Sequence, residues 1–493
     1  MSMQLSKENL AAIRNHAVIL PDASVFTLRE KVLQFGTGVL LRGLPDYFID
    51  KANRQGLFNG RVVVVKSTDS GDAGVFPRQD GLYTLCIRGI EDGHKVEENI
   101  VCSAISRVLS ARDQWEEILQ LAHTPEMQII VSNTTEVGIQ LVEDDIRQSP
   151  PVSFPGKLLA FLHRRYAAFN GSPDSGMVIV PTELIVDNGK KLADIVRQLA
   201  RKAGLEDGFF AWMEDHCRFC SSLVDRIVPG KPDGAALQQL THDLGYTDGL
   251  LAIAEVYRLW AIEGDEKVRS VLSYAAADPG VVIEPDIEIY RELKLRLLNG
   301  THTLSCGLAF LSGFATVKNA MDDAAFSAYI TDLMLKEIAP SIPYKVPLAE
   351  ARDFGLKVLD RFRNPHLQHQ WLSITMQYSS KMRMRVIPVL QRHYEQHATP
   401  PAHMTLGFAA YLLFMRGGDH PVNDDRAGYF ADLWEKYPAP EVATIALKDA
   451  SLWGADLSRL PGFEGAVRLQ LDDLINKGAA ATLAPLVKIK SVL

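Results

Sequence analysis

Apolar residues follow two different patterns along this chain. Short continuous apolar runs, rich in β-branched side chains, occupy residues 32–35, 61–66, 128–131 and 176–180. Runs of this length without alternation are typical of parallel strands that are buried on both faces. The segments between the runs carry apolar side chains at helical spacing, over residues 39–49, 114–122 and 155–169. Strands that alternate with helices predict an α/β domain.

The pattern changes near Pro285. The residues beyond it read as a series of helices with no further β-branched run, over 288–299, 304–312, 321–337, 348–360, 366–378, 381–395, 404–416, 425–436, 439–449 and 464–476. We therefore predict a Rossmann-like α/β domain over residues 1–280 and an all-helical domain over residues 281–493. In the first domain, residues 82–88 and 95–101 flank a turn and predict a β-hairpin.

A glycine-rich turn follows the first predicted strand. Phe35-Gly36-Thr37-Gly38 stands between this strand and the next predicted helix. In a dinucleotide-binding unit, Gly36 would permit the tight turn and Gly38 would let the backbone approach a pyrophosphate. Leu41 stands where the usual pattern has its third glycine. The turn is therefore either a cofactor site or an ordinary strand–helix connection.

Polar residues follow the next two strands. An acidic residue at the end of the second strand commonly binds the adenosine ribose of NAD. This chain has Lys66 there, with Asp69 three residues later. Lys66 would suit the 2′-phosphate of NADP and Asp69 could reach a ribose, so both cofactors stay open. Asn133 and Thr135 follow the third strand and are either cofactor ligands or the cap of a helix.

The segment from Tyr290 to Thr303 places Lys294, Asn299 and His302 among leucines. Buried polar groups are costly unless they are paired or used in function. The segment is therefore either a core helix with a stray lysine or part of an active site. In an α-helix Asn299 would lie about 140° and His302 about 80° around the axis from Lys294. Either the helix is interrupted near Asn299, or a substrate wraps around a wide face.

A basic cluster lies later in the predicted helical domain. Lys381 and Arg385 are four residues apart and share a helix face, while Arg383 lies between them on another face. Such residues usually form a solvated surface. The alternative is a clamp for a carboxylate, because guanidinium groups bind carboxylates in a bidentate manner.

Composition narrows the classes of function. A chain of 493 residues, 47% hydrophobic and 23% charged, is expected to form a soluble protein of two or three domains. A net charge of −8 argues against a nucleic-acid partner, and no apolar run is long enough for a membrane span. The five cysteines form neither a disulfide framework nor a metal cluster, and the N-terminus lacks a signal-peptide pattern. We expect a cytoplasmic protein without a metal, and the oligomeric state stays open.

Several motifs together resemble the mannitol dehydrogenase family of polyol-specific long-chain dehydrogenases. The resemblance rests first on the spacing Lys294-x4-Asn299-x2-His302. Four further motifs occur in the family's order, at residues 35–43, 187–189, 224–227 and 361–365. The resemblance implies an NAD-linked, metal-independent enzyme with a Rossmann-like domain and a helical substrate domain.

The resemblance also implies roles for single residues. Lys294 would be the general acid/base, Asn188 and Asn299 would stabilise the alkoxide, and His302 would orient the substrate. Lys381 and Asp225 would contact the substrate, although a buried Asp225–Arg226 pair is usually structural. Hydride addition to a ketone creates an alkoxide, which needs fixed donors and a proton source.

Three further segments, at residues 79–84, 132–136 and 223–228, resemble the hexuronate-reducing branch of the family. They imply reduction of D-tagaturonate to D-altronate, a small acidic sugar. Reduction of fructuronate, oxidation of mannitol or another polyol, and a sugar-phosphate substrate are the alternatives among enzymes. An NAD-binding regulatory protein is the alternative outside them. Arg291 stands where mannitol-type members have a glutamate, and this leaves the proton route open.

Overall fold

The computed structural model describes residues 3–67, 74–134 and 138–488, without the side chains of 485–488. The chain forms two compact units. Residues 1–88 and 95–287 make the first, and residues 89–94 and 288–493 make the second. The second unit therefore includes the tip of a hairpin whose strands begin in the first.

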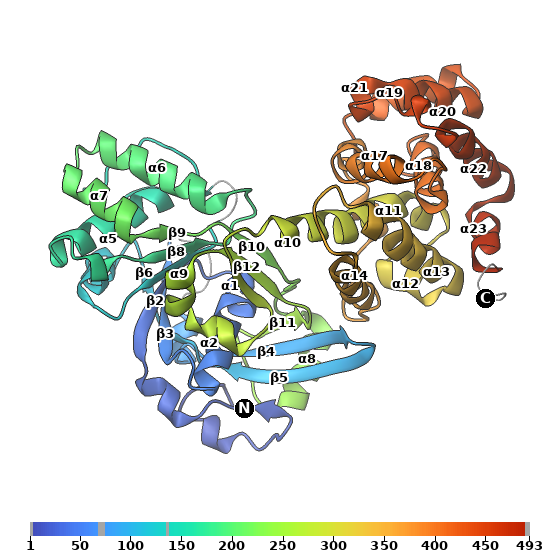
Figure 1. Cartoon of the computed structure of the whole chain (residues 1–493). Helices are drawn as coiled ribbons and strands as arrows, with labels where there is room; N and C mark the ends of the chain where they lie inside the picture. The colour runs from blue at the N-terminus through green and yellow to red at the C-terminus, as the bar shows by residue number, and fades with distance from the viewer. Residues whose placement is uncertain (1–2, 68–73, 135–137, 489–493) are drawn as a thin grey trace. The chain divides into compact units, whose positions relative to one another are not determined.

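The first unit is built on a six-stranded sheet in which every pairing is parallel. The strands lie in the order β6 (Ile105–Ser110), β3 (Gly60–Lys66), β2 (Arg29–Phe35), β7 (Ile129–Ser132), β8 (Val178–Pro181) and β9 (Arg218–Phe219) (Figure 1). In chain order this is the 3-2-1-4-5-6 arrangement of dinucleotide-binding folds. The direction of winding reverses between β2 and β7, and ligands bind outside the carboxyl ends of strands at such a point.

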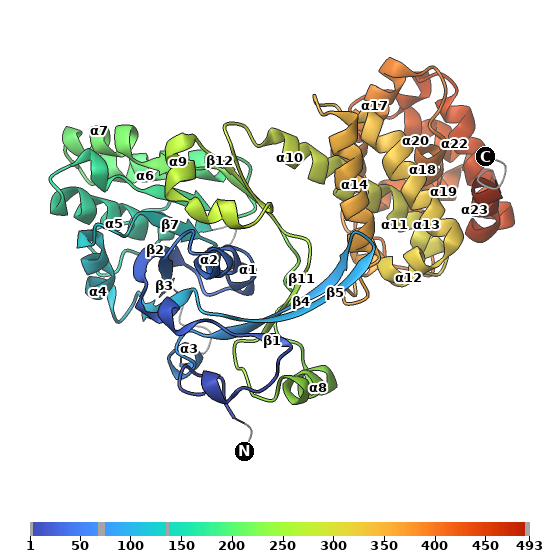
Figure 2. The ribbon, with the colours of Figure 1, turned by 60° about the horizontal axis from the view of Figure 1, so that its bottom comes forward.

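Both faces of this sheet are buried, as the continuous apolar runs predict. Val63 and Val65 of β3 face one hydrophobic cluster, whereas Val62 and Val64 face the other. One face is covered by α4 (Trp115–Gln120), α5 (Phe154–Ala168), α6 (Asn188–Lys202) and α7 (Asp207–His216). The other face packs on α1 (Val39–Gly43) and α2 (Pro45–Arg54). Figure 2 shows α5, α6 and α7 grouped together on the first face.

Two smaller sheets complete the first unit. The sequence predicted one hairpin but not that it belongs to a larger sheet, and it did not predict the second sheet. The predicted hairpin is confirmed as β4 (Tyr83–Glu91) and β5 (His94–Cys102), which lie between β1 (Val18–Ile19) and β11 (Ala252–Glu255). A three-stranded sheet has the order β10 (Ser222–Asp225), β12 (Leu259–Glu263) and β13 (Val281–Glu284). Because β13 pairs with β12, the first unit continues past the predicted boundary at residue 280 to Ile287. Short helices α3 (Val75–Arg78), α8 (Gly234–Leu244) and α9 (Glu266–Val271) lie in the connections.

The second unit is a bundle of helices (Figure 1). Its α-helices are α10 (Glu288–Leu293), α11 (Thr301–Leu311), α12 (Val317–Asp322), α13 (Ala324–Asp332), α14 (Leu348–Phe362), α15 (Trp371–Ile374), α16 (Tyr378–Lys381), α17 (Ile387–Gln396), α18 (Ala402–Phe414), α19 (Ala427–Lys436), α20 (Ala439–Lys448), α21 (Ala450–Trp453), α22 (Phe463–Lys477) and α23 (Ala479–Lys488). Three further segments are π-helices: η7 (Lys294–Gly300), η8 (Leu333–Ile338) and η10 (Met382–Val386). Helix α18 is buried along almost its whole length, as expected of a helix that is apolar all round. The predicted Rossmann-like domain followed by a helical domain is thus confirmed.

The helix predicted over residues 366–378 is wrong. Only the single-turn helices α15 and α16 form there, and residues 364–370 are irregular. The carboxamide oxygen of Asn364 accepts the backbone N–H of His366, which is a turn, and Pro365 disfavours a helix before it. The carbonyl of His369 accepts the N–H of Val317 from α12 instead of a bond within a helix. A tertiary pairing thus replaces the local periodic structure.

Candidate active site

The glycine turn after β2 lies at the switch point of the sheet. Gly36 has a φ of 127°, and a Cβ at this position would come 2.9 Å from the carbonyl oxygen of Asn133 at the end of β7. Only glycine meets both conditions. A Cβ built on Gly38 would meet no atom within 4 Å, so the backbone there is open to a ligand. This cradle fits the pyrophosphate of a dinucleotide.

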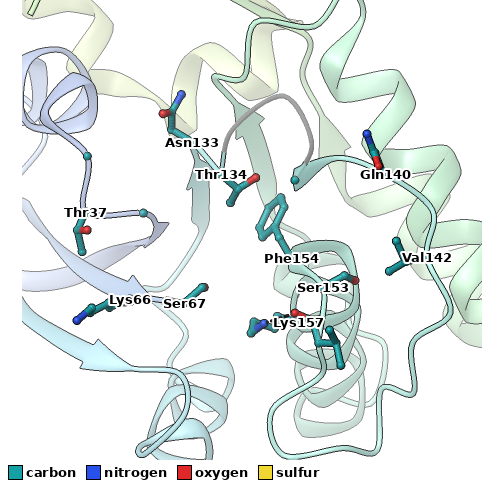
Figure 3. A pocket seen from close by; sticks show the side chains of 14 residues that line it. Thr37, Lys66, Ser67, Asn133, Thr134, Gln140, Val142, Ser153, Phe154 and Lys157 are labelled. Atoms are coloured by element: carbon teal, nitrogen blue, oxygen red, sulfur yellow. Dashed lines mark hydrogen bonds between the residues drawn. The ribbon is translucent and has the colours of Figure 1, made fainter. Parts of the chain in front are cut away.

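A cavity of about 410 Å³ adjoins the turn. It is lined by Gly36, Thr37, Gly38, Lys66, Ser67, Asn133, Thr134, Gly138, Gln140, Val142, Val152, Ser153, Phe154 and Lys157 (Figure 3). Five of the residues predicted to bind the cofactor are among them. Phe35 lies beneath the turn with its ring 5.1 Å from that of Phe154. Asp69 and Thr135, the two others predicted, lie outside the described residues.

The far wall of this cavity comes from α5. The sequence predicted this helix but not that it lines the cavity. Phe154 and Lys157 project from α5 into the cavity (Figure 3). The ammonium of Lys157 donates to the carbonyl of Val152 at 2.8 Å, and burial lowers its pKa, although nearby Asp144 acts in the opposite direction. The only sequence signal was a lysine inside an apolar helix. Its position places a cation beside the pyrophosphate cradle.

Two hydrogen bonds in series hold the same turn. The hydroxyl of Tyr83 donates to the carbonyl of Arg42 at 2.7 Å, and the Arg42 guanidinium donates to the carbonyl of Thr37 at 2.9 Å. The segment at residues 79–84, which helped to mark the hexuronate branch, thus acts structurally. Tyr83 holds Arg42, and Arg42 holds the cofactor turn.

Backbone groups hold the Asn188 side chain in this structure, and its role at the alkoxide stays a prediction. Its side-chain amide donates to the carbonyls of Pro181, Glu183 and Ser222 at 2.9 to 3.2 Å. Its carboxamide oxygen accepts the backbone N–H groups of Gly189 and Ser222, both at 2.9 Å. An amide has only two N–H groups, and backbone carbonyls occupy both. Asn188 is therefore an anchor that ties β8 and β10 to the start of α6.

Asp225 is the last residue of strand β10, Arg226 follows it, and both are buried. The Arg226 guanidinium donates to the carbonyls of Glu255 and Gly43, at 2.9 and 2.6 Å, and lies 4.6 Å from the centre of the Tyr47 ring. These contacts give Arg226 the structural role expected of it. A substrate contact by Asp225 stays a prediction.

Lys294 begins the π-helix η7, and Asn299 lies near its end. In a π-helix each N–H bonds to the carbonyl five residues earlier, so residues five apart lie on the same side of the helix. Lys294 and Asn299 are five apart and thereby come to one face, and His302 follows Asn299 at a helical spacing of three. The segment is therefore wound more widely, not broken. Among the described residues, the Asn299 carboxamide has no hydrogen-bond partner, which leaves it able to donate.

His302 is buried in α11 within a group of rings. It stacks on Phe362 at 4.2 Å between ring centres and meets His369 and Trp371 edge to face at 5.1 and 5.9 Å. Burial lowers the pKa of His302 well below its usual value, and four nearby basic side chains act in the same direction. Its Nε2, together with Trp371 Nε1, is buried without a hydrogen-bond partner in the described part of the chain. A buried polar atom without a partner requires an explanation, and a bound ligand is one.

Arg296 was not predicted, yet it connects η7 to η10. Its guanidinium binds both carboxylate oxygens of Glu292, at 2.9 and 3.1 Å, and donates to the carbonyls of Met384 and Arg385 at 2.7 and 3.1 Å. Arg291, at the family's glutamate position, pairs with Glu288. Because Glu292 is engaged by Arg296 through both oxygens, it does not replace the missing glutamate as a free proton carrier. The sequence signal was an i, i+4 acid–base pair in an apolar helix.

The structure separates the predicted basic cluster into two parts. Lys381 donates to the carbonyl of Ile374 at 3.0 Å, and Arg385 donates to the hydroxyl of Thr303 at 3.2 Å. Burial lowers the pKa of both groups, and both act on His302. The Nε of Arg385 is buried and unpartnered within the described chain. Arg383 instead is exposed and reaches the carbonyl of Ser451 at 3.4 Å, so it does not join the cluster.

The fold and these residues define a class of protein. The first unit has a doubly wound sheet with an open glycine turn. The helical unit that follows in sequence carries Lys294, Asn299 and His302. This combination is typical of a two-domain dinucleotide-dependent dehydrogenase. The chain matches two family models, the mannitol dehydrogenase Rossmann domain over residues 30–273 and the mannitol dehydrogenase C-terminal domain over residues 286–475. The chain belongs to the mannitol dehydrogenase family, as the sequence motifs predicted.

Individual relatives agree with this assignment. Altronate oxidoreductase of Bacillus subtilis is 38% identical over 459 residues, which cover 92% of this chain and 94% of the relative. Altronate oxidoreductase of Pectobacterium carotovorum is 37% identical over 472 residues, or 92% and 96% of the two chains. Among solved structures, a ternary complex of Pseudomonas fluorescens mannitol 2-dehydrogenase with NAD and D-mannitol matches with a TM-score of 0.66 at 24% identity, over 99% and 100% of the chains. A substrate-free D-sorbitol dehydrogenase matches with a TM-score of 0.76 at 20% identity, over 98% and 100%. These two structures support the fold.

Two features are absent from the described ranges. No helix there has both the length and the apolar character needed to cross a membrane. No group of three or more His, Cys, Asp or Glu side chains that could hold a metal ion occurs among those residues.

Proposed function

We propose that this protein is an NAD-dependent oxidoreductase that interconverts D-tagaturonate and D-altronate. The observation that carries the proposal is the cationic cluster of Lys381 and Arg385 beside His302, in the unit that also holds Lys294 and Asn299. Cations that are partly buried beside an unpartnered nitrogen suit an anionic sugar better than a neutral polyol. Altronate oxidoreductases at 37–38% identity over 92% of the chain support the same substrate class.

The first unit would hold the cofactor. Gly36, Thr37 and Gly38 would receive the pyrophosphate, and Lys66 and Asn133 line the adjoining cavity. When bound, the nicotinamide supplies or accepts the hydride. The residues of this chain would bind the cofactor and the sugar, orient them and polarise the reacting carbonyl.

The second unit would supply the proton and the polarising groups. Lys294 would donate the proton to the alkoxide during reduction and remove it during oxidation. The carboxamide of Asn299, which has no hydrogen-bond partner among the described residues, lies on the same face of η7 as Lys294 and would stabilise the alkoxide. His302 would orient the substrate through its unpartnered Nε2. An ammonium that both polarises and protonates the oxygen makes this a route that needs no metal. We further propose that the enzyme works in the cytoplasm.

One spectrophotometric experiment tests the proposal. Oxidation of NADH and of NADPH is followed with tagaturonate, fructuronate and fructose at equal concentrations. We expect the highest kcat/KM with tagaturonate and NADH. A higher value with fructuronate would reassign the substrate within the hexuronates, and a higher value with fructose would contradict the acidic substrate. Binding of NADH without turnover of any of the three sugars would favour the regulatory alternative.

The carboxylate clamp has a matched pair of variants in the chain. Arg385→Ala removes a guanidinium beside His302, whereas Arg383→Ala removes one that faces Ser451. We expect Arg385→Ala to raise the KM for tagaturonate by about tenfold or more, as loss of a charge-assisted hydrogen bond does, and Arg383→Ala to leave it unchanged. Equal effects of the two variants would contradict the clamp.

A further inference from the structure

His369 lies against the proposed substrate-orienting histidine, although neither the sequence motifs nor the family assignment drew attention to it. It stands in the irregular segment between α14 and α15, where the sequence predicted a helix. The His369 ring meets the His302 ring edge to face at 5.1 Å, and the residue is exposed while His302 is buried. The His369 carbonyl is fixed by the N–H of Val317, so the backbone holds the ring in place. A solvent-exposed ring thus contacts a buried one whose Nε2 has no hydrogen-bond partner among the described residues.

Cations face this pair of rings from three different elements. Arg361 comes from α14, Lys381 from α16 and Arg385 from η10. Although part of His369 is open to solvent, desolvation of its imidazole lowers its pKa, and Arg361 and Lys381 act in the same direction. Burial lowers the pKa of His302, and His369, Arg361, Arg385 and Lys381 add to this. Asp424 is the carboxylate that acts on Lys381. The charge at His369 is therefore disfavoured until an anion enters, and a bound carboxylate would reverse the effect.

We propose that His369 is a specificity-determining residue that binds the carboxylate of an acidic sugar and takes up a proton from solvent as it does so. The inference deepens the proposed function and rests on it. In the free enzyme the imidazole would be neutral near neutral pH, and in the complex it would be an imidazolium next to the carboxylate. An acidic sugar would therefore gain a further charge-assisted hydrogen bond that a neutral polyol cannot elicit.

The proposal predicts a pH dependence with a definite sign. The pKa of His369 is lowered in the ligand-free protein. A bound carboxylate would raise it, so binding would take up a proton between the two values. The KM for tagaturonate should be flat below the free-state pKa, and it should then rise with pH by up to about tenfold per unit until the bound-state pKa is reached. Substrate binding below neutral pH should therefore be tighter than above it.

Three variants of the full chain test the proposal with NADH and tagaturonate across pH 5.5 to 8.5. His369→Asn should raise the KM at low pH by about tenfold and flatten its pH profile, with the NADH dissociation constant and the Tm unchanged. His369→Lys keeps a cation at all these pH values and should give a low KM with a flat profile. His397→Asn is the matched control, because His397 is also exposed in the same unit but lies against His393 at 4.7 Å between ring centres. It should behave like the unmodified enzyme.

The outcomes separate this inference from the proposed function. If the unmodified enzyme oxidises NADH with neither tagaturonate nor fructuronate, the proposed function fails first. If the unmodified enzyme does oxidise NADH with one of these acids, and His369→Asn keeps its KM and pH profile, the assignment of His369 is overturned. A change in kcat alone, or an equal rise in KM for fructose, would also overturn it, because a purely structural role would not single out the acid.

Discussion

Replacement of Arg296 by methionine removes the connection between two π-helices. Arg296 lies in η7, binds Glu292 through both carboxylate oxygens, and holds two carbonyls of η10. The Arg296 and Glu292 side chains are only 8% and 12% exposed, so solvent screens the pair weakly. Methionine fills a similar volume without charge. The variant therefore leaves Glu292 as a buried, uncompensated carboxylate.

The size of the effect follows from this burial. Removal of one partner from a buried ion pair costs about 3–5 kcal/mol. For a unit of about 200 residues, 1 kcal/mol corresponds to about 2–4 °C in Tm. We expect Arg296→Met to lower the Tm of the helical unit by about 10 °C. We also expect a higher KM for tagaturonate, because the backbone that carries Arg385 loses its support.

Scanning calorimetry and steady-state kinetics measure the two effects, and Arg291→Met is the control. Arg291 also pairs with a glutamate one turn away, but these side chains are 21% and 35% exposed. An exposed pair contributes about 1 kcal/mol or less, so the control should melt within about 3 °C of the unmodified protein. A Tm for Arg296→Met equal to that of Arg291→Met would refute the reasoning. An unchanged KM with a lowered Tm would restrict Arg296 to stability.

Three further outcomes follow from the described geometry. Gly36→Ala should weaken NADH binding by tenfold or more in a fluorescence titration, because its Cβ would lie 2.9 Å from the Asn133 carbonyl oxygen at a φ of 127°; unchanged affinity would contradict the cradle. Burial raises the pKa of Asp46 from 3.8 to about 7, so the folded state holds a proton that the unfolded state releases, and stability falls as pH rises from about 4 to 7. Asp46→Asn should therefore stabilise the protein at pH 8 by up to about 4 kcal/mol and have little effect at pH 4, as pH-dependent melting would show. Lys294→Ala should lower kcat by about 10²–10⁴-fold while NADH binding is kept, and an active variant would remove Lys294 as the acid.

The parallel sheet was predictable because its cause is local. A strand buried on both faces must be apolar at successive positions, and the valines of β3 show this directly. The turn at Gly36 was predictable for a similar reason, since only glycine tolerates its backbone conformation. The backbone contacts of Asn188 were not predictable, because its partners lie at three separate places in the chain. A motif identified the residue but not which atoms would engage its amide.

The helical unit shows the same limit more strongly. Periodicity predicted helices around Lys294 and over 366–378, and it could not distinguish a π-helix from an α-helix or foresee the loop that holds His369. The reason is that long-range contacts decide both cases. Arg296 binds carbonyls 88 and 89 residues away, and the His369 carbonyl binds Val317. These partners cannot be identified from the residues that neighbour Arg296 and His369 in the sequence.

The π-helix η7 explains how an apolar helix can carry Lys294 and Asn299 on one face. An α-helix would turn Asn299 about 140° away from Lys294, but the wider turn brings the two to one face. Such a segment is intrinsically less favourable than an α-helix, so it needs support from outside. Arg296 supplies it by binding the carbonyls of η10, a second π-helix that carries Arg385. The same contact ties the segment that carries Lys294 and Asn299, the residues proposed for proton transfer, to the segment that carries Arg385, which is proposed to bind the anion. Arg296→Met therefore tests stability and the proposed substrate site together.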